Sequence, residues 1–187
     1  MKKSLIICIL FALLALPMFG QGFYFDIGLG IGKGTTEIDG TKVEISGADE
    51  IALDLGMKLG YGPIAGMPLY IAGAVEGMGH RFSDDFNYIQ FTSILLGPSV
   101  ILYPIPMLQI SACAGYSMTA NDSDLGTMYD SESGYAGSIS AAIDLGSGNN
   151  GLLVGGKYYL SINTMETDYE QKMSMISIFI KYAYRHK

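Results

Sequence analysis

The feature that most restricts the fold of this chain is an unbroken two-residue alternation of apolar residues with small or polar ones. Between Glu50 and Tyr61, every odd position is apolar and every even position is small or charged. A period of two is that of a β-strand, whose successive side chains point to opposite faces. The same alternation covers residues 23–32, 69–76, 108–118, 135–145, 152–162 and 176–184. These seven segments are predicted to be strands.

An eighth strand is expected at about residues 88–103, where the alternation is less regular. Ile89 and Phe91 are out of phase with the apolar positions that follow them. A β-bulge near residues 92–93 would restore the phase, because a bulge inserts one extra residue into a strand. Pro98 removes one ladder hydrogen bond in any case.

The connections between the expected strands alternate in length. Short links fall at residues 62–68, 103–106 and 146–150, and long polar links fall at 33–49, 80–87, 119–134 and 163–171. Short turns at one end and long loops at the other are typical of outer-membrane barrels. The expected fold is therefore all-β: an eight-stranded antiparallel up-and-down transmembrane β-barrel.

The first 22 residues have the pattern of a secretory signal peptide. Lys2 and Lys3 precede an apolar stretch at residues 5–16, and Gly20-Gln21-Gly22 offers small residues to signal peptidase. The expected organisation is a signal peptide at 1–22 and one barrel domain at 23–187, with a cut two residues earlier as the alternative. Cys8 leaves with the signal, so Cys113 has no cysteine to pair with.

The faces of the strands differ in charge, which decides which face lies inside. The chain is 49% hydrophobic with a mean hydropathy of +0.31, yet only 16% of its residues are charged. In the seven clear strands the apolar face carries no charge, whereas a water-facing surface holds roughly a quarter to a third of charged residues. A soluble lipocalin-like barrel is the alternative, but a small-residue lumen and a lipid-facing apolar surface fit better. Besides Glu50, the charged candidates for the lumen are Asp26, Asp54, Lys58, Glu76, Asp144, Lys157 and Lys181.

Two further expectations follow from this placement. Asp26, Lys58 and Lys181 would lie near one another at the short-turn end and form ion pairs that close the interior, since unpaired buried charges are costly. Aromatic residues would mark both membrane interfaces, as in barrel girdles. The short-turn girdle would hold Phe23, Tyr61, Tyr103, Tyr182 and Tyr184, and the other would hold Phe82, Phe86, Tyr116 and Tyr135.

Other function classes find little support in the sequence. The 18 acidic residues outnumber the 11 basic ones, which disfavours nucleic acid as a partner. The two histidines are expected on a loop (His80) and on the tail (His186), so no catalytic, cofactor-binding or metal residue is assigned and no enzyme or cofactor is expected. Residues 121–132 imitate a calcium loop, but Leu125 occupies a ligand position. The acidic loops are interpreted as a solvated rim that repels anions or binds cations loosely.

These features together resemble the small eight-stranded outer-membrane barrels of diderm bacteria, the OmpX and OmpA transmembrane-domain group, over the whole mature chain. Residues 96–103, Leu-Gly-Pro-Ser-Val-Ile-Leu-Tyr, and Ala114-Gly115-Tyr116 are similar to the fourth and fifth strands of OmpW/OprG-type proteins. Such barrels usually end on an aromatic residue, whereas here Tyr184 is followed by Arg185-His186-Lys187.

The resemblance implies export to the bacterial outer membrane and non-enzymatic roles. Its implied partners are outer-membrane lipids and the barrel-assembly machinery. The OmpW-like side implies a narrow, porin-like conduit for small, partly hydrophobic molecules, which is the leading expectation. The OmpX-like side implies a plugged, surface-exposed barrel whose loops act in adhesion, structure or contact with host surface molecules. An eight-stranded lumen is only wide enough for its own side chains, so a broad porin is not expected.

Overall fold

The computed structural model describes residues 22–84, 87–124, 126, 131–165 and 168–186, with the backbone alone at 131–133. The expected signal peptide, apart from Gly22, and Phe86 lie outside the described residues. The strands are β1 Gly22–Ile38, β2 Thr41–Lys42, β3 Asp49–Gly62, β4 Leu69–Ser83, β5 Tyr88–Ile105, β6 Leu108–Thr119, β7 Asp122–Ser123, β8 Ser131–Asp144, β9 Asn150–Met165 and β10 Glu170–Arg185. Within these ranges no helix is long and apolar enough to cross a membrane.

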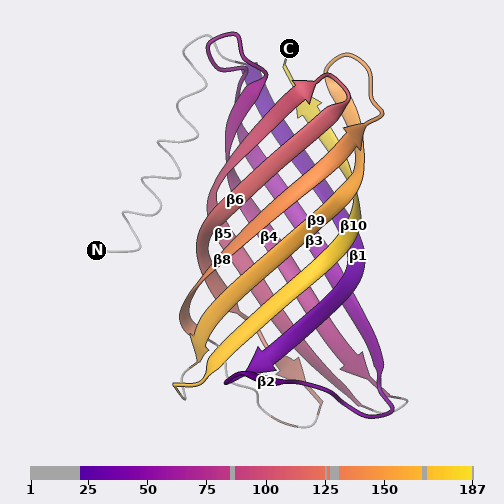
Figure 1. Cartoon of the computed structure of the whole chain (residues 1–187), viewed down its shortest axis with the longest axis vertical. Helices are drawn as coiled ribbons and strands as arrows, with labels where there is room; N and C mark the ends of the chain where they lie inside the picture. The colour runs from indigo at the N-terminus through magenta and orange to yellow at the C-terminus, as the bar shows by residue number, and fades with distance from the viewer. Residues whose placement is uncertain (1–21, 85–86, 125, 127–130, 166–167, 187) are drawn as a thin grey trace.

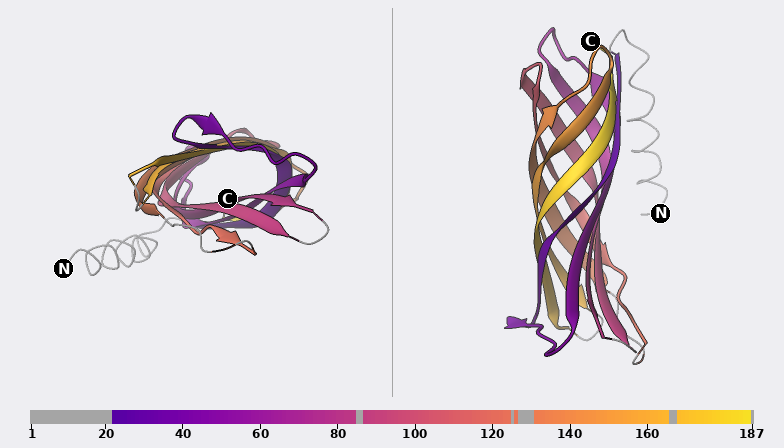
Figure 2. Two further views of the ribbon diagram at one scale, coloured as in Figure 1. Left: turned by 90° about the horizontal axis from the view of Figure 1, so that it is seen from below. Right: turned by 90° about the vertical axis from the view of Figure 1, so that its right-hand side faces the viewer.

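The eight long strands form one closed antiparallel ring in the order β1-β3-β4-β5-β6-β8-β9-β10, and β10 pairs back to β1. The two-residue strands β2 and β7 pair with β1 and β5 outside this ring. Ring neighbours are consecutive long strands, so the topology is up-and-down, and Figure 1 shows the strands tilted around one barrel. Seen along its axis in Figure 2, the barrel is elongated in cross-section. The predicted fold class is confirmed.

The two ends of the barrel differ in their connections, although two of the four links that were expected to be long are short. The short connections 63–68, 106–107 and 145–149 lie at the end where β1 begins and β10 finishes, which we call the turn end and which is uppermost in Figure 1. The opposite end, called the loop end, carries β2, β7 and the connections between residues 38 and 49, 83 and 88, 119 and 131, and 165 and 170. The first and third of these are the longest of the barrel, whereas the second and fourth are shorter than the turn-end connection 63–68. Strand pairing continues further toward the loop end than expected. His80, for example, lies within β4 and not on a loop.

The outward face of the barrel is a belt of exposed apolar side chains. Ile178 is 71% exposed, Ile176 69% and Leu55 63%, in the middle parts of β10 and β3. In water such a surface would be strongly unfavourable, whereas a bilayer solvates it, and the closed ring satisfies the backbone groups that lipid cannot. The belt is therefore the surface that meets lipid.

The expected bulge in the eighth strand is absent, and this prediction was wrong. The ladder between β4 and β5 runs without a shift from Leu69↔Leu102 to Ser83↔Tyr88. Phe91 and Leu95 instead point inward and are buried, so apolar residues occupy both faces of β5. When both faces of a strand are apolar, the sequence pattern no longer shows which positions face inward.

Two aromatic residues assigned to the girdles lie inside the barrel. Tyr103 and Phe82 are 3% and 5% exposed and pack in the lumen. Their positions follow the regular alternation of β5 and β4, which directs them inward. The outward aromatic residues Tyr116 and Tyr135 face each other across β6 and β8, and Tyr182 is exposed near the turn end.

The ladder between β5 and β6 is interrupted partway along the two strands. Leu96 pairs with Tyr116 and Ser99 with Cys113, but the two pairs between them are missing at Pro98 and its neighbour Gly97. Two glycines keep the strands close there, because Gly97 and Gly115 approach each other backbone to backbone. A Cβ on Gly97 would overlap the carbonyl oxygen of Ala114.

We expect Gly97→Ala to lower the free energy of unfolding by about 1–3 kcal/mol, because the strands must separate to admit the methyl group. The matched control is Gly56→Ala, an inward glycine of β3 whose Cβ would come no nearer than 3.7 Å to a heavy atom. Urea unfolding in phospholipid vesicles, followed by far-UV circular dichroism, measures both. Equal unfolding midpoints for the two variants would show that β5 and β6 are not closely packed at Gly97.

Candidate functional site

The seven charged residues assigned to the lumen all have inward, buried side chains. Their exposed fractions do not exceed 3%, although the lumen runs the length of the barrel. They do not form one cluster. Four of them join in an ion-pair network, two have no ion pair with any described residue, and the last lies at the turn end. The four that are joined are Asp54, Lys58, Glu76 and Lys157.

The central charge cluster, formed by these four residues, crosses the lumen. Glu76 on β4 lies 3.3 Å from the ammonium groups of both Lys58 on β3 and Lys157 on β9. Lys157 also donates to Asp54. β9 lies across the ring from β3 and β4, so these ion pairs tie opposite walls together. Serine hydroxyls complete the polar contacts: Lys58 donates to Ser111 at 2.7 Å and Ser177 donates to Asp54 at 3.0 Å.

The expected ion pairs of Asp26 are not found among the described residues. Lys58 lies directly opposite Asp26 in the ladder, but its ammonium group turns to Glu76 and Ser111. Asp26 instead accepts a 2.6 Å hydrogen bond from the Tyr24 hydroxyl, and its second oxygen has no hydrogen-bond partner. The Lys181 ammonium lies 4.5 Å from the centre of the Phe179 ring, a cation–π contact.

Asp144 pairs with a residue that the sequence interpretation did not include. Its carboxylate lies 2.8 Å from Nη2 of Arg185, the last residue of β10. The same Nη2 donates to the backbone oxygen of Pro106 at 3.1 Å, and the guanidinium carbon lies 3.9 Å from the centre of the Tyr103 ring. Arg185 thus crosses the lumen at the turn end, where the family resemblance implied a terminal aromatic residue.

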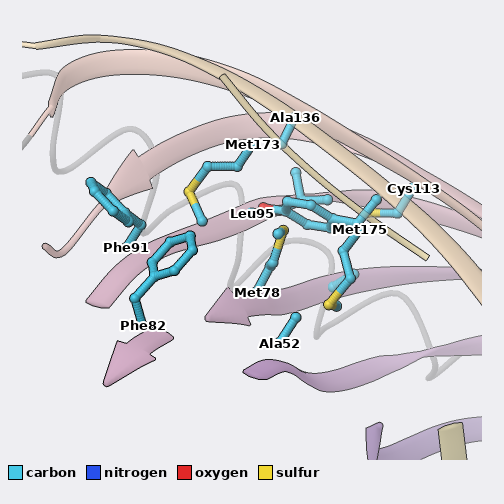
Figure 3. Packing of buried hydrophobic residues seen from close by; sticks show 11 residues of the cluster. Ala52, Met78, Phe82, Phe91, Leu95, Cys113, Ala136, Met173 and Met175 are labelled. Carbon is cyan, nitrogen blue, oxygen red and sulfur yellow. The ribbon is translucent and has the colours of Figure 1, made fainter. Parts of the chain in front are cut away.

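An apolar plug fills the lumen between the central charge cluster and the loop end. Its large side chains come from β4, β5, β9 and β10, and Figure 3 shows several of them meeting in the interior. Val43 and Ala48 from the connection after β2 pack against this plug. The buried members of the plug are Ala52, Ala74, Met78, Phe82, Phe91, Leu95, Cys113, Ala136, Tyr159, Met173 and Met175.

A tyrosine layer fills the lumen at the turn end. The ring centres of Tyr24 and Tyr70 are 5.2 Å apart, and those of Tyr70 and Tyr103 are 5.9 Å apart in an edge-to-face arrangement. Gln109 donates hydrogen bonds to the hydroxyls of Tyr24 and Tyr103 at 2.9 and 2.8 Å. The central charge cluster therefore has packed side chains on both sides of it along the barrel axis.

His80 ties two strands together where their ladder ends. β1 and β3 pair only as far as Gly32↔Ala52, and beyond that pair they separate toward the loop end. The His80 ring bridges them: Nδ1 lies 2.8 Å from the Thr36 hydroxyl of β1, and Nε2 lies 2.9 Å from the Glu50 carboxylate of β3. Thr36 is fully buried, so the arrangement serves to close the wall.

Sequence reasoning missed the packed lumen on either side of the charges. It expected a lumen of small residues with a few charges, yet Phe91, Met173 and Tyr103 fill much of it. The available signal was the run of apolar residues out of phase in residues 88–103.

The calcium-like segment 121–132 lies partly outside the described residues, including Leu125 and the side chain of Glu132. Elsewhere in the described chain, no three His, Cys, Asp or Glu side chains are grouped to hold a metal ion.

Comparison with known proteins identifies a fold class. No protein-family model matches the chain, and no curated protein matches it. The chain resembles the crystal structure of Neisserial surface protein A, with a TM-score of 0.54 and 15% identity over 85% of this chain and 95% of that one. The chain has the fold of the small eight-stranded outer-membrane β-barrels.

Two further solved structures are similar at lower TM-scores. One is Ail, the attachment invasion locus protein of Yersinia pestis, in complex with the heparin analogue sucrose octasulfate, with a TM-score of 0.48, 11% identity, and coverage of 86% of this chain and 98% of that one. The other is the outer membrane protein OprG from Pseudomonas aeruginosa, with a TM-score of 0.46, 14% identity, and coverage of 88% and 96%.

Proposed function

We propose that this chain is an outer-membrane barrel with a plugged lumen, which acts through its loop end at the cell surface. One observation carries the proposal: packed layers fill the lumen in succession. The apolar plug, the central charge cluster and the tyrosine layer follow one another along the lumen of the described barrel. Buried ion pairs that join opposite walls favour a closed interior, since separating them would leave uncompensated charges.

The proposed location follows from the belt of exposed apolar side chains and the expected signal peptide at residues 1–22. The barrel domain of residues 23–187 would contact outer-membrane lipids, and the barrel-assembly machinery would insert it. With the termini and short turns in the periplasm, the loop end faces outward. This orientation places the longest connections where a surface protein meets its partners.

The loop end is acidic, and this restricts the class of partner. Among the described residues, its exposed acidic side chains outnumber the exposed basic residues Lys33, Lys42 and Arg81. The hydrogen bond from Lys42 lowers the pKa of the Glu44 carboxyl, which therefore stays ionised at neutral pH. A polyanion such as the heparin analogue bound by Ail does not suit such a surface, because like charges repel. The proposed partners are basic groups of host surface molecules.

Adhesion of cells that display the protein tests this role. The variant Glu44→Gln/Asp168→Asn/Glu170→Gln neutralises exposed loop-end carboxylates outside the packed lumen. We expect it to fold as the wild type does, by heat modifiability on gels, and to lose most adhesion to host cells. A turn-end variant, Met67→Ser, is the matched control. Undiminished adhesion of the triple variant would contradict a role for the acidic loop end.

A conduit for small hydrophobic molecules is the second candidate, and the interrupted ladder at Pro98 is the observation that favours it. If molecules passed sideways through the barrel wall at this interruption, Pro98→Val would restore a backbone N–H that can donate a hydrogen bond to the ladder, and would slow their passage. Under the plugged account, uptake of a fluorescent hydrophobic probe into vesicles containing the protein is the same for wild type and Pro98→Val. Slower uptake by Pro98→Val would establish the conduit.

A further inference from the structure

The turn end carries a pocket that the proposed surface role does not use. Its volume is about 340 Å³, and it lies where the β3–β4 connection, the β5–β6 connection and the end of β10 meet. These segments are far apart in the sequence and are brought together by closure of the barrel. Four of the six prolines of the chain line it: Pro63, Pro68, Pro104 and Pro106. Proline fixes its own backbone, so these walls are preorganised.

The inner wall of the pocket is aromatic. Tyr70 and Tyr103, which also belong to the tyrosine layer, face it from β4 and β5. Both hydroxyls have partners: Tyr70 donates to the backbone oxygen of His186 at 3.1 Å, and Tyr103 accepts from Gln109. What the tyrosines and prolines offer a ligand is therefore apolar surface, of the kind that binds a flat ring.

Arg185 is the charged residue of the pocket lining. It is 5% exposed, and both of its polar contacts with described residues leave from Nη2. Its Nε is buried and has no hydrogen-bond partner in the part of the chain that the structure describes. An unpartnered buried donor is costly, and a nearby acceptor oxygen would satisfy it. The counter-ion Asp144 does not line the pocket, so Arg185 is the charged side chain that a ligand would meet there.

We propose that this pocket binds a small aromatic carboxylate from the periplasmic side, with the ring against the tyrosines and prolines and the carboxylate on Arg185. An ionised acceptor makes the stronger hydrogen bond to a guanidinium and complements its charge. The volume is at the lower end of ligand pockets, which suits a molecule of one ring. This site stands at the opposite end of the barrel from the loop-end role and does not depend on it.

The test is titration of 4-fluorophenylacetate into the full-length mature protein in lipid nanodiscs, followed by ¹⁹F NMR, with empty nanodiscs as the blank. We expect saturable binding that requires the protein. The neutral analogue 4-fluorophenylacetamide should bind at least about tenfold more weakly, because it lacks the charged acceptor. Absence of saturable binding up to about 10 mM, or equal binding of the amide, would overturn the proposal.

Two variants locate the binding. Arg185→Lys keeps a cation beside Asp144 but removes the Nε donor, and should weaken binding about tenfold or more. Ile105→Trp places a large ring in the pocket from an exposed position at the end of β5 and should abolish binding without changing the fold. Tyr169→Trp at the loop end is the control and should bind as the wild type does. Wild-type binding by both pocket variants would refute this location.

Discussion

Replacing Glu76 with glutamine is expected to lower the free energy of unfolding by about 3–5 kcal/mol, the largest effect of any single change considered. Glu76 is fully buried and lies 3.3 Å from both Lys58 and Lys157. The amide fills the same space but carries no charge. Lys58 then loses its counter-ion inside the barrel, and Lys157 keeps only Asp54.

The expected loss depends on burial, which a matched exposed pair tests. Lys42 and Glu44 are 2.7 Å apart, but their side chains are 56% and 72% exposed. Glu44→Gln should leave stability unchanged within error, because exposed ion pairs contribute little. The double variant Glu76→Gln/Lys58→Met should recover part of the loss by removing the orphaned cation. The chain has no Trp, so urea unfolding in vesicles is best followed by circular dichroism. A wild-type midpoint for Glu76→Gln would mean that the cluster contributes nothing to closure.

Arginine in place of Ile178 is expected to cost about 2–4 kcal/mol in a bilayer. Ile178 lies in the middle of β10, opposite Ile31 in the ladder, and is 71% exposed on the outward face. A charge there would lie in the hydrocarbon region, where it cannot be hydrated. The effect is the second largest and tests which surface meets lipid.

The control for Ile178→Arg is Tyr169→Arg, which places the same charge at an exposed position of the loop end. Unfolding in vesicles should be unaffected by this change, because position 169 lies outside the membrane. If Ile178→Arg were as stable in vesicles as the wild type, the apolar belt would not be the lipid-facing surface.

Strand positions and faces were predictable because one physical rule governs them. Alternation at Ile178 and Lys58 identifies outward and inward positions, since an apolar residue and a charged one cannot exchange faces without cost. The rule failed for β5, where Phe91 and Leu95 are as apolar as their outward neighbours. A lumen that needs large apolar side chains to fill it looks, in sequence, like a lipid-facing surface.

The partners of the lumen charges were not predictable from strand order. Strand neighbours placed Asp26 opposite Lys58, and the ladder has that register. The long lysine side chain, however, reaches Glu76 on the next strand, and Lys157 reaches both Asp54 and Glu76 from across the ring. Such contacts depend on the diameter and the elongated cross-section of the closed barrel. The order of the strands along the chain does not specify either of these. The role of Arg185 at the turn end was missed for the same reason.

Electrical recording from a planar bilayer containing the purified, refolded protein tests the plugged lumen most directly. We expect no conductance steps for the wild type, because the apolar plug, the central charge cluster and the tyrosine layer follow one another along the lumen of the described barrel. Insertion is verified in the same membrane by protease cleavage of the loop end. Reproducible steps from inserted wild-type protein, altered in size by Lys58→Gln or Asp54→Asn, would contradict the account and establish a conducting lumen.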